Sequence, residues 1–200
     1  MWDRLITYGD SWTAGHGVET EIKYKEVIDC GILINNLRLM NGWPRYLAQY
    51  LDIPFSNLAF CNKSNPEIVN DVKDTVNQLT NKDLIIVMLS YAYRGDGEPI
   101  KDVSELNNIL KDKQYYIVNS FYPTFKEVPK SNTVDKTHFL LPDNTFAEFL
   151  INYEKQTGVS VWEYGFKKVN EQGSFLGGDF HPNTEGYKLI AWELYNRIKK

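Results

Sequence analysis

The stretch Leu84-Ile85-Ile86-Val87-Met88-Leu89 decides the fold class of this 200-residue chain. It is continuous and apolar, it is rich in β-branched side chains, and no polar residue marks a side that faces solvent. A strand that is apolar on both faces is typical of the centre of a parallel sheet that helices cover from both sides. The stretch therefore predicts a buried central strand.

Shorter strand-like segments flank this stretch along the chain. Leu5 to Tyr8 and residues 54–60 precede it, and Tyr115 to Val118 and residues 159–162 follow it. Helical patterns alternate with these segments, which is typical of βαβ units. Because such crossovers are right-handed, the pattern predicts an α/β protein, a three-layer α/β/α sandwich with about five mostly parallel strands.

Apolar residues at helical spacing predict four helices. Ser64 and Glu67 fit a capping box ahead of one helix, and Asp143 is the predicted cap of a second that ends at Gly158. A third is expected over residues 44–51. The last helix of the chain carries an apolar stripe. That stripe consists of Tyr187, Ile190, Ala191, Leu194 and Ile198.

The length of the chain suits one domain over residues 1–200, because domains commonly run to about 100–200 residues. Two long connections, near residues 15–41 and 121–142, interrupt the rhythm of strands and helices. Connections of this length are usually functional or disordered. Since both contain apolar residues, we expect partly ordered flaps over the edge of the sheet.

Charge and hydropathy exclude several classes of protein. The chain has 22 Lys and Arg against 26 Asp and Glu, a net charge of −4, which argues against a nucleic-acid partner held by a positive field. The longest uncharged central run, Leu84 to Tyr93, is shorter than the roughly 20 residues that span a membrane. Asp3 and Arg4 interrupt the only early apolar run, so we expect no signal peptide and a cytoplasmic protein. No metal site and no cofactor are expected, and the oligomeric state stays open.

The string Gly9-Asp10-Ser11 directly follows the first predicted strand. In open α/β sheets ligands bind outside the carboxyl ends of the strands, so a serine at this point is a candidate nucleophile. The alternative is a turn in which Asp10 or Ser11 hydrogen-bonds the backbone or caps a helix.

A second string, Asp179-Phe180-His181-Pro182-Asn183, immediately precedes the last helix. A serine hydroxyl is a poor nucleophile until a base takes its proton, and histidine is suited to that task near neutral pH. An acidic group then orients the imidazole, as Asp179 would do for His181 if the fold brings both to Ser11. The alternative is that His181 and Asn183 only cap the helix.

Together the two strings, placed around an α/β pattern, resemble the SGNH/GDSL hydrolase family over the whole chain. The resemblance implies a flavodoxin-like sandwich and ester hydrolysis without a metal. It assigns Ser11 as the nucleophile, His181 as the base and Asp179 as the third member. The expected substrate is a small-molecule or carbohydrate ester. Because the sequence shows no signal of an apolar groove, carbohydrate O-deacetylation is slightly favoured over long-chain lipolysis.

The oxyanion-binding positions depart from the family's motifs. By spacing, Asn62 stands where the second motif has glycine. The third motif, usually Gly-x-Asn-Asp, reads Ser90-Tyr91-Ala92-Tyr93-Arg94 here, so that Ala92 takes the place of the asparagine. We expect the oxyanion to bind the backbone N–H of Ser11, with Asn62 and with Arg94, whose five donors make it the candidate substitute. The alternatives are a turn residue at 62 and a surface or ion-pairing arginine at 94.

The aspartate of the last motif is also displaced, since Asp179 lies two residues before His181 instead of three. Residues two apart in an extended segment point the same way, so Asp179 can still reach the imidazole. The alternative is that a backbone carbonyl orients the imidazole, so that the catalytic group is a Ser–His dyad. These departures indicate a divergent member of the family, and the arginine past the third strand resembles that of viral members, which would act in a host cell.

Other candidates carry less weight. We expect His16 to be a polar loop residue and His138 to be structural or exposed. Several aromatic residues follow strand ends, where they would form either a platform for an acyl chain or sugar or ordinary core packing. They are Trp12, Tyr91, Tyr93, Phe121, Tyr122 and Phe180. The favoured function is a serine esterase, and the alternative is a degenerate hydrolase scaffold with a binding or structural role.

Overall fold

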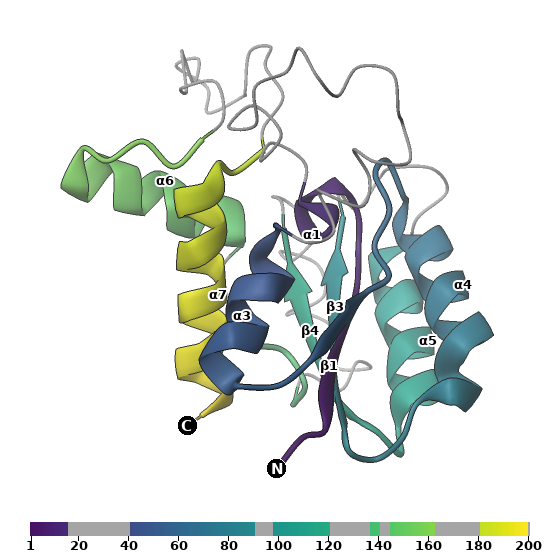
Figure 1. Cartoon of the computed structure of the whole chain (residues 1–200). Coiled ribbons are helices and arrows are strands. Elements are labelled where there is room, and N and C mark those ends of the chain that lie inside the picture. Colours follow the sequence, from purple (N-terminus) through teal and green to yellow (C-terminus); the bar gives the residue numbers. More distant parts are fainter. Residues whose placement is uncertain (16–40, 91–97, 121–136, 141–144, 163–180, 200) are drawn as a thin grey trace, which may run out of the picture.

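The computed structural model describes residues 1–15, 41–90, 98–120, 137–140, 145–162 and 181–199. Within them, a parallel sheet has the strand order β2-β1-β3-β4. The strands are β1 (Arg4–Tyr8), β2 (Phe55–Asn57), β3 (Asp83–Leu89) and β4 (Gln114–Asn119). The predicted central strand is confirmed, because every residue of β3 is buried and the strand lies between β1 and β4 (Figure 1).

Helices cover both faces of the sheet, as the apolar β3 requires (Figure 1). Alternate residues of β3 enter two separate cores. Leu84, Ile86 and Met88 pack with α3 (Trp43–Leu51) and α7 (Thr184–Ile198). The other alternate residues pack on the opposite face with α4 (Asn65–Thr75) and α5 (Pro99–Leu110). The three-layer α/β/α arrangement is therefore confirmed.

Three of the predicted helices follow their sequence signals closely. The capping box of Ser64 and Glu67 begins α4, which passes into the short 3₁₀ turn η3 (Val76–Gln78). The helix predicted over 44–51 is α3. In α7 the whole predicted stripe is buried. Helix α5 was not predicted, because the buried carboxyl of Asp102 occupies a position in its otherwise apolar stripe.

The cap of α6 (Phe146–Thr157) is a correction. Thr145 begins this helix: its hydroxyl accepts a hydrogen bond from the backbone N–H of Glu148, whose carboxylate binds the backbone N–H of Thr145 in return. Such a reciprocal pair satisfies two N–H groups at once, which a lone cap does not. The predicted cap, Asp143, lies outside the described residues. The helix ends at Gly158, as predicted.

The fifth strand predicted over residues 159–162 is not formed in the described part of the chain, where Trp162 makes only an isolated antiparallel bridge to Pro182. The backbone of this segment has other partners. The carbonyl of Val161 accepts the backbone N–H of Asn183, and the Asn183 amide donates to the carbonyls of Ser160 and Trp162. The segment therefore supports the entry to α7 instead of extending the sheet.

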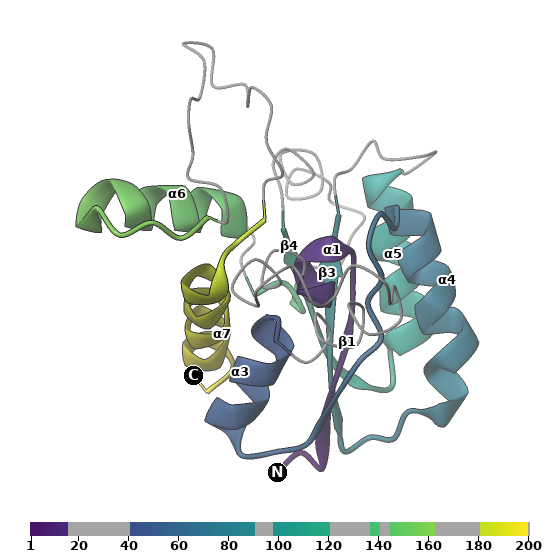
Figure 2. The ribbon, with the colours of Figure 1, turned by 45° about the horizontal axis from the view of Figure 1, so that its top comes forward.

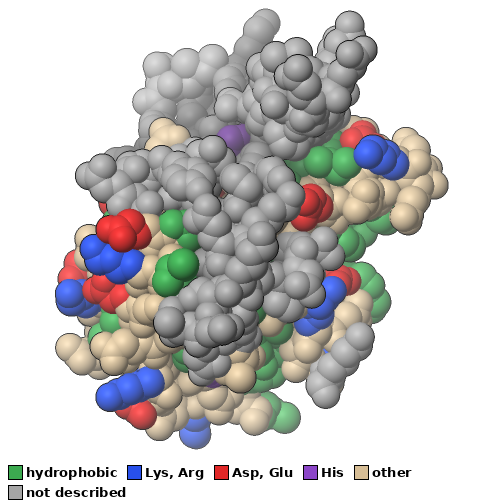
Figure 3. Space-filling model, turned by 180° about the vertical axis from the view of Figure 1, so that it is seen from behind, with side chains coloured by type: hydrophobic (Ala, Val, Ile, Leu, Met, Phe, Trp, Pro, Cys, Tyr) green, Lys and Arg blue, Asp and Glu red, His purple; other side chains and the backbone are tan. Residues whose placement is uncertain are grey.

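The two long connections lie mostly outside the described residues. The described piece of the second, residues 137–140, runs beside β4 through a parallel bridge between Phe139 and Ile117. None of the helices in the described ranges is long and apolar enough to cross a membrane. On the face seen in Figure 3, acidic and basic side chains lie next to one another. One exposed ion pair between oppositely charged side chains is Lys73–Glu105.

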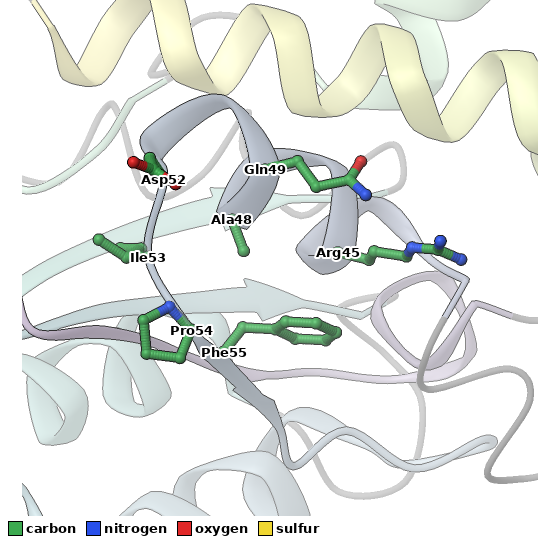
Figure 4. A pocket seen from close by; sticks show the side chains of 7 residues that line it. All are labelled: Arg45, Ala48, Gln49, Asp52, Ile53, Pro54 and Phe55. Atoms are coloured by element: carbon green, nitrogen blue, oxygen red, sulfur yellow. The ribbon is translucent and has the colours of Figure 1, made fainter.

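A pocket of about 400 Å³ lies between α3 and the start of β2 (Figure 4). Its lining consists of Arg45, Ala48, Gln49, Asp52, Ile53, Pro54 and Phe55. Phe55 pairs with Leu5 near the beginning of β1, so the pocket lies toward the amino ends of the parallel strands. The residues that carry the predicted chemistry follow the carboxyl ends, at the opposite edge.

Candidate active site

The Gly9-Asp10-Ser11 turn leads directly from β1 into the short helix α1 (Ser11–Ala14). The carboxylate of Asp10 accepts the backbone N–H of Trp12 at 3.1 Å, and its backbone carbonyl accepts the N–H groups of Thr13 and Ala14. Asp10 therefore caps the helix, as the alternative interpretation of the motif proposed. Figure 2 looks toward this edge of the sheet and places α1 between the α4/α5 pair and the α3/α7 pair.

Glycine at position 9 is a steric requirement of this turn. A Cβ there would lie 2.8 Å from the Cβ of Thr13 and 3.0 Å from the carbonyl oxygen of Met88. The φ of +158° is also one that other residues rarely adopt. The sharp turn brings Ser11 to the carboxyl edge of the sheet immediately after the strand ends.

The entry to α7 positions the histidine. The Asn183 side chain accepts the backbone N–H of Gly186 at 3.0 Å and caps the helix, so that part of the alternative interpretation is correct. Gly186 lies so close to the segment before it that a Cβ would come within 2.8 Å of the Cβ of Pro182. These contacts fix the backbone on the C-terminal side of His181.

The two residues then meet. The Nε2 atom of His181 lies 2.8 Å from the Oγ of Ser11, although 170 positions separate them in the sequence. Both are buried, with 5% of Ser11 and 9% of His181 exposed. A nucleophile and a base within hydrogen-bond reach are the arrangement that proton abstraction from the hydroxyl requires.

The last residue of β2 and the loop after it contact the same turn. The Asn57 side chain donates to the backbone carbonyl of Thr13 at 2.8 Å and accepts from the hydroxyl of Thr7 at 3.0 Å. The backbone N–H of Phe60 donates to the carbonyl of Gly9 at 3.2 Å. The second motif thus contacts the turn that carries Ser11, as a neighbour in the sheet should.

Asn62 is exposed and has a φ of +67°. This left-handed conformation favours glycine, and among other residues asparagine tolerates it well. Asn62 thus lies in a turn, and its part in binding the oxyanion stays a prediction. The other predicted members of the site, Asp179 and Arg94, lie outside the described residues, as does Ala92.

Two remaining candidates prove to be structural. His138 stacks on Tyr115 with ring centroids 3.9 Å apart, and its Nδ1 lies 3.1 Å from the backbone oxygen of that residue. Trp12 is 1% exposed and meets Trp162 edge to face at 5.8 Å, so it belongs to the core. His16 and the other five aromatic candidates are outside the described ranges.

Sequence reasoning missed two buried polar residues beside the turn. The hydroxyl of Ser90, directly after β3, donates to the Asp10 carboxylate at 2.6 Å. Asn65, the first residue of α4, binds the backbone of Ser90. The signal for Ser90 was its place at the carboxyl end of the central strand. Asn65 lies between the two capping-box residues, Ser64 and Glu67, and the sequence gives it no separate signal.

Comparisons with known proteins agree with this architecture. No protein-family model matches the chain, and no curated protein matches its sequence. Among solved structures, a psychrotrophic esterase from Pseudoalteromonas sp. aligns with a TM-score of 0.55 at 14% identity, over 98% of this chain and 97% of the other. Phospholipase A1 from Streptomyces albidoflavus NA297 aligns with a TM-score of 0.51 at 12% identity, over 100% and 99% of the two chains.

A member of the lipolytic protein G-D-S-L family from Veillonella parvula DSM 2008 also matches, with a TM-score of 0.48 at 14% identity over 98% of each chain. At such identities a similarity in structure reports the fold and not the activity. The two structures with a TM-score above 0.5 therefore show that this chain has the same fold as an esterase and a phospholipase.

Proposed function

We propose that this chain is a serine esterase or acylhydrolase that forms an acyl-enzyme on Ser11 with His181 as the base. The observation that carries the proposal is the 2.8 Å contact between Nε2 of His181 and Oγ of Ser11. Both groups lie at the carboxyl edge of the sheet, where open α/β folds bind their ligands. Solved structures with the same fold include an esterase and a phospholipase, which is consistent with this chemistry.

In the proposed reaction, His181 takes the proton of the Ser11 hydroxyl as Oγ attacks the ester carbonyl carbon. The tetrahedral intermediate collapses when the imidazolium returns that proton to the departing alkoxide, which leaves as an alcohol. Water then attacks the acyl-enzyme and gives its proton to His181. The acid product leaves when the proton passes to Ser11 Oγ, so the enzyme is regenerated without a redox step.

For the oxyanion we propose the backbone N–H of Ser11, with the loop at Asn62 and the guanidinium of Arg94 as further donors. Asp179 is the proposed partner of the His181 ring. The substrate class is a small or carbohydrate-linked ester, with O-deacetylation as the favoured case. Preorganised donors matter here, because the loss of one oxyanion donor costs on the order of 10²–10³ in turnover.

The test is hydrolysis of p-nitrophenyl acetate and its longer homologues by the purified chain. Ser11→Ala and His181→Ala should each lower kcat/KM by at least about 10³-fold, because the nucleophile and its base act as a unit. Ser104→Ala and His138→Gln are matched controls, since Ser104 is exposed on α5 and His138 packs on Tyr115. Equal turnover by the Ser11 variant and the wild type would overturn the proposal.

One observation favours a second function, a binding or structural role on a hydrolase scaffold. Ala92 stands where the third motif has its amide donor, so the chain lacks one group that the chemistry normally uses. A phosphonate that reacts with activated serines separates the two. A hydrolase is labelled at Ser11 and loses the label in Ser11→Ala, whereas a degenerate scaffold takes up no more label than that variant.

A further inference from the structure

Three buried polar side chains connect the central strand to the turn that carries Ser11. They come from three separate places in the chain: Asp10 follows β1, Asn65 begins α4 and Ser90 follows β3. The exposed fractions of these residues are 2%, 0% and 0% respectively. Polar groups buried this deeply are costly unless their hydrogen bonds are made, so their geometry is well determined.

Asn65 fixes the backbone of Ser90 from both sides. Its Oδ1 accepts the Ser90 N–H at 2.8 Å, and its Nδ2 donates to the Ser90 carbonyl at 3.4 Å. The amide thus extends the hydrogen bonding of the sheet by one residue beyond β3. The Ser90 side chain then has only a small range of positions available.

From this position the Ser90 hydroxyl donates to Oδ2 of Asp10 at 2.6 Å, while Oδ1 of the same carboxyl group accepts the backbone N–H of Trp12. The two oxygens of Asp10 are therefore bound to different elements, the central strand and α1. Ser11 is the residue between Asp10 and Trp12. A shift of the Asp10 carboxyl group would consequently rotate both the backbone N–H and the Oγ of Ser11.

We propose that Ser90 is a positioning residue for the nucleophile, which acts through Asp10 on the orientation of Ser11. This inference rests on the proposed esterase function. In the Gly-x-Asn-Asp pattern, position 90 is a glycine, which has no hydroxyl, so the bond to Asp10 is a feature of this chain. In this chain the side chain of Ser90, at the glycine position of the third motif, hydrogen-bonds Asp10 of the first motif.

Removal of the hydroxyl should affect the chemical step more than substrate binding. In Ser90→Ala and Ser90→Gly, kcat for p-nitrophenyl acetate should fall roughly tenfold, because small misplacements of reacting groups are expensive in rate. KM should stay within about twofold, since Ser90 is fully buried and is not accessible to a bound ester. The rate of phosphonate labelling at Ser11 should fall by the same factor as kcat.

Ser120→Ala is the matched control. Ser120 is equally buried and follows β4, and its hydroxyl donates to the backbone carbonyl of Leu89 at 2.8 Å, next to Ser90 in the sequence. The substitution removes a serine hydroxyl from the same carboxyl edge of the sheet without removing a hydrogen bond to Asp10. It should lower the melting temperature about as much as Ser90→Ala does and leave kcat unchanged. An equal loss of kcat in both variants would show a general effect of stability and overturn the inference.

A double-mutant cycle tests the route through Asp10. Ser90→Ala should cost roughly tenfold in kcat in the wild type and nothing further in the Asp10→Ala background. A full tenfold loss in that background would overturn the proposed route, as would wild-type kcat in Ser90→Ala alone. If the wild type itself shows neither Ser11-dependent turnover nor labelling, the esterase proposal fails and the inference falls with it.

Discussion

The two edges of the sheet each bury an aspartate, but they pair it with different groups. At the amino edge Asp83 begins β3 and is 1% exposed. It accepts two hydrogen bonds from the Arg4 guanidinium, at 2.7 and 3.1 Å, and one from the backbone N–H of Thr80 at 2.6 Å. At the carboxyl edge, the described contacts of Asp10 are with a hydroxyl and with backbone N–H of α1.

This difference separates a contact that holds the fold from one that also positions chemistry. Burial by itself would raise the pKa of Asp83, but the hydrogen bonds from Arg4 and Thr80 outweigh it and lower that pKa below its ordinary value. The Arg4–Asp83 pair joins β1 to β3 far from Ser11. Its removal should change stability alone, whereas changes around Asp10 should change activity as well.

The largest effect should follow Gly9→Ala at the carboxyl edge. The added Cβ meets Thr13 and the carbonyl of Met88, so the turn that carries Ser11 must shift. We expect a loss of roughly 3 kcal/mol in stability and of about 100-fold in kcat/KM. Chemical denaturation and ester hydrolysis measure the two quantities.

The control is Gly158→Ala at the end of α6, where φ is +72° and no atom lies within 4 Å of the new Cβ. It should cost about 1 kcal/mol of backbone strain and leave turnover as it was. If both glycine variants lose the same fraction of activity, the close packing of the Gly9 turn has no special role.

The amino edge should give the next largest effect. Asp83→Ala removes the carboxylate that accepts from the Arg4 guanidinium and from the Thr80 N–H, which we expect to cost roughly 2 kcal/mol near pH 7. Turnover per folded molecule should stay at the wild-type value. A fall in kcat comparable with that of Ser90→Ala would mean that the two edges are not functionally distinct.

The pH dependence of the same variant follows from the direction of the pKa shift. Because the folded-state pKa of Asp83 is lowered, its contribution to stability is present above the unfolded pKa of about 3.9 and is lost as the pH falls through the folded value. The gap in unfolding free energy between wild type and Asp83→Ala should therefore narrow below about pH 4. Denaturant titrations at pH 7 and pH 3 measure it.

The sequence was most informative where one physical requirement dominates a position. The apolar run of β3, the capping box at Ser64, the stripe of α7 and the left-handed end of α6 at Gly158 each follow from burial or backbone geometry within a few neighbouring residues. The fold class could therefore be predicted before any tertiary contact was known.

The features that sequence reasoning missed depend on contacts between distant segments. The polar Asp102 interrupts the apolar stripe of α5, so the sequence pattern did not predict this helix. The segment at 159–162 has strand-like residues, yet its carbonyls bind Asn183. For the site, motif spacing suggested Ser11 and His181, but nothing local indicates that Asn65 binds the backbone of Ser90 or that the Ser90 hydroxyl binds Asp10.

Asp102 offers a third buried aspartate that sharpens the comparison. Within the described residues its Oδ2 has no hydrogen-bond partner, and burial raises its pKa to about 6. A carboxyl group with a raised folded-state pKa destabilises the protein above that pKa, and the penalty disappears below the unfolded value. Asp102→Asn should thus be more stable than wild type by about 2 kcal/mol at pH 8 and equal to it near pH 3.

Thermal unfolding at several pH values tests this, with Asp112→Asn as the control because Asp112 is exposed just beyond the end of the same helix. That variant should follow the wild-type curve throughout. A gain for Asp102→Asn that does not depend on pH would assign the effect to helix propensity or packing instead of to the buried charge.

The smallest effect should follow substitution of two helix-capping residues. It tests whether the cap of α7 helps to position His181. Asn183 caps α7 two residues after His181, and Thr145 caps α6, which carries no group of the candidate site. Each alanine variant should cost about 1 kcal/mol, the usual value of a cap. Only Asn183→Ala should also lower kcat, by a few-fold, because its amide fixes the backbone beside the histidine.

Asn183→Asp, which keeps the cap acceptor but removes the donors to Ser160 and Trp162, should restore the stability of the cap and not the rate. Equal kcat in the two alanine variants would mean that the contact between His181 and Ser11 is held from elsewhere.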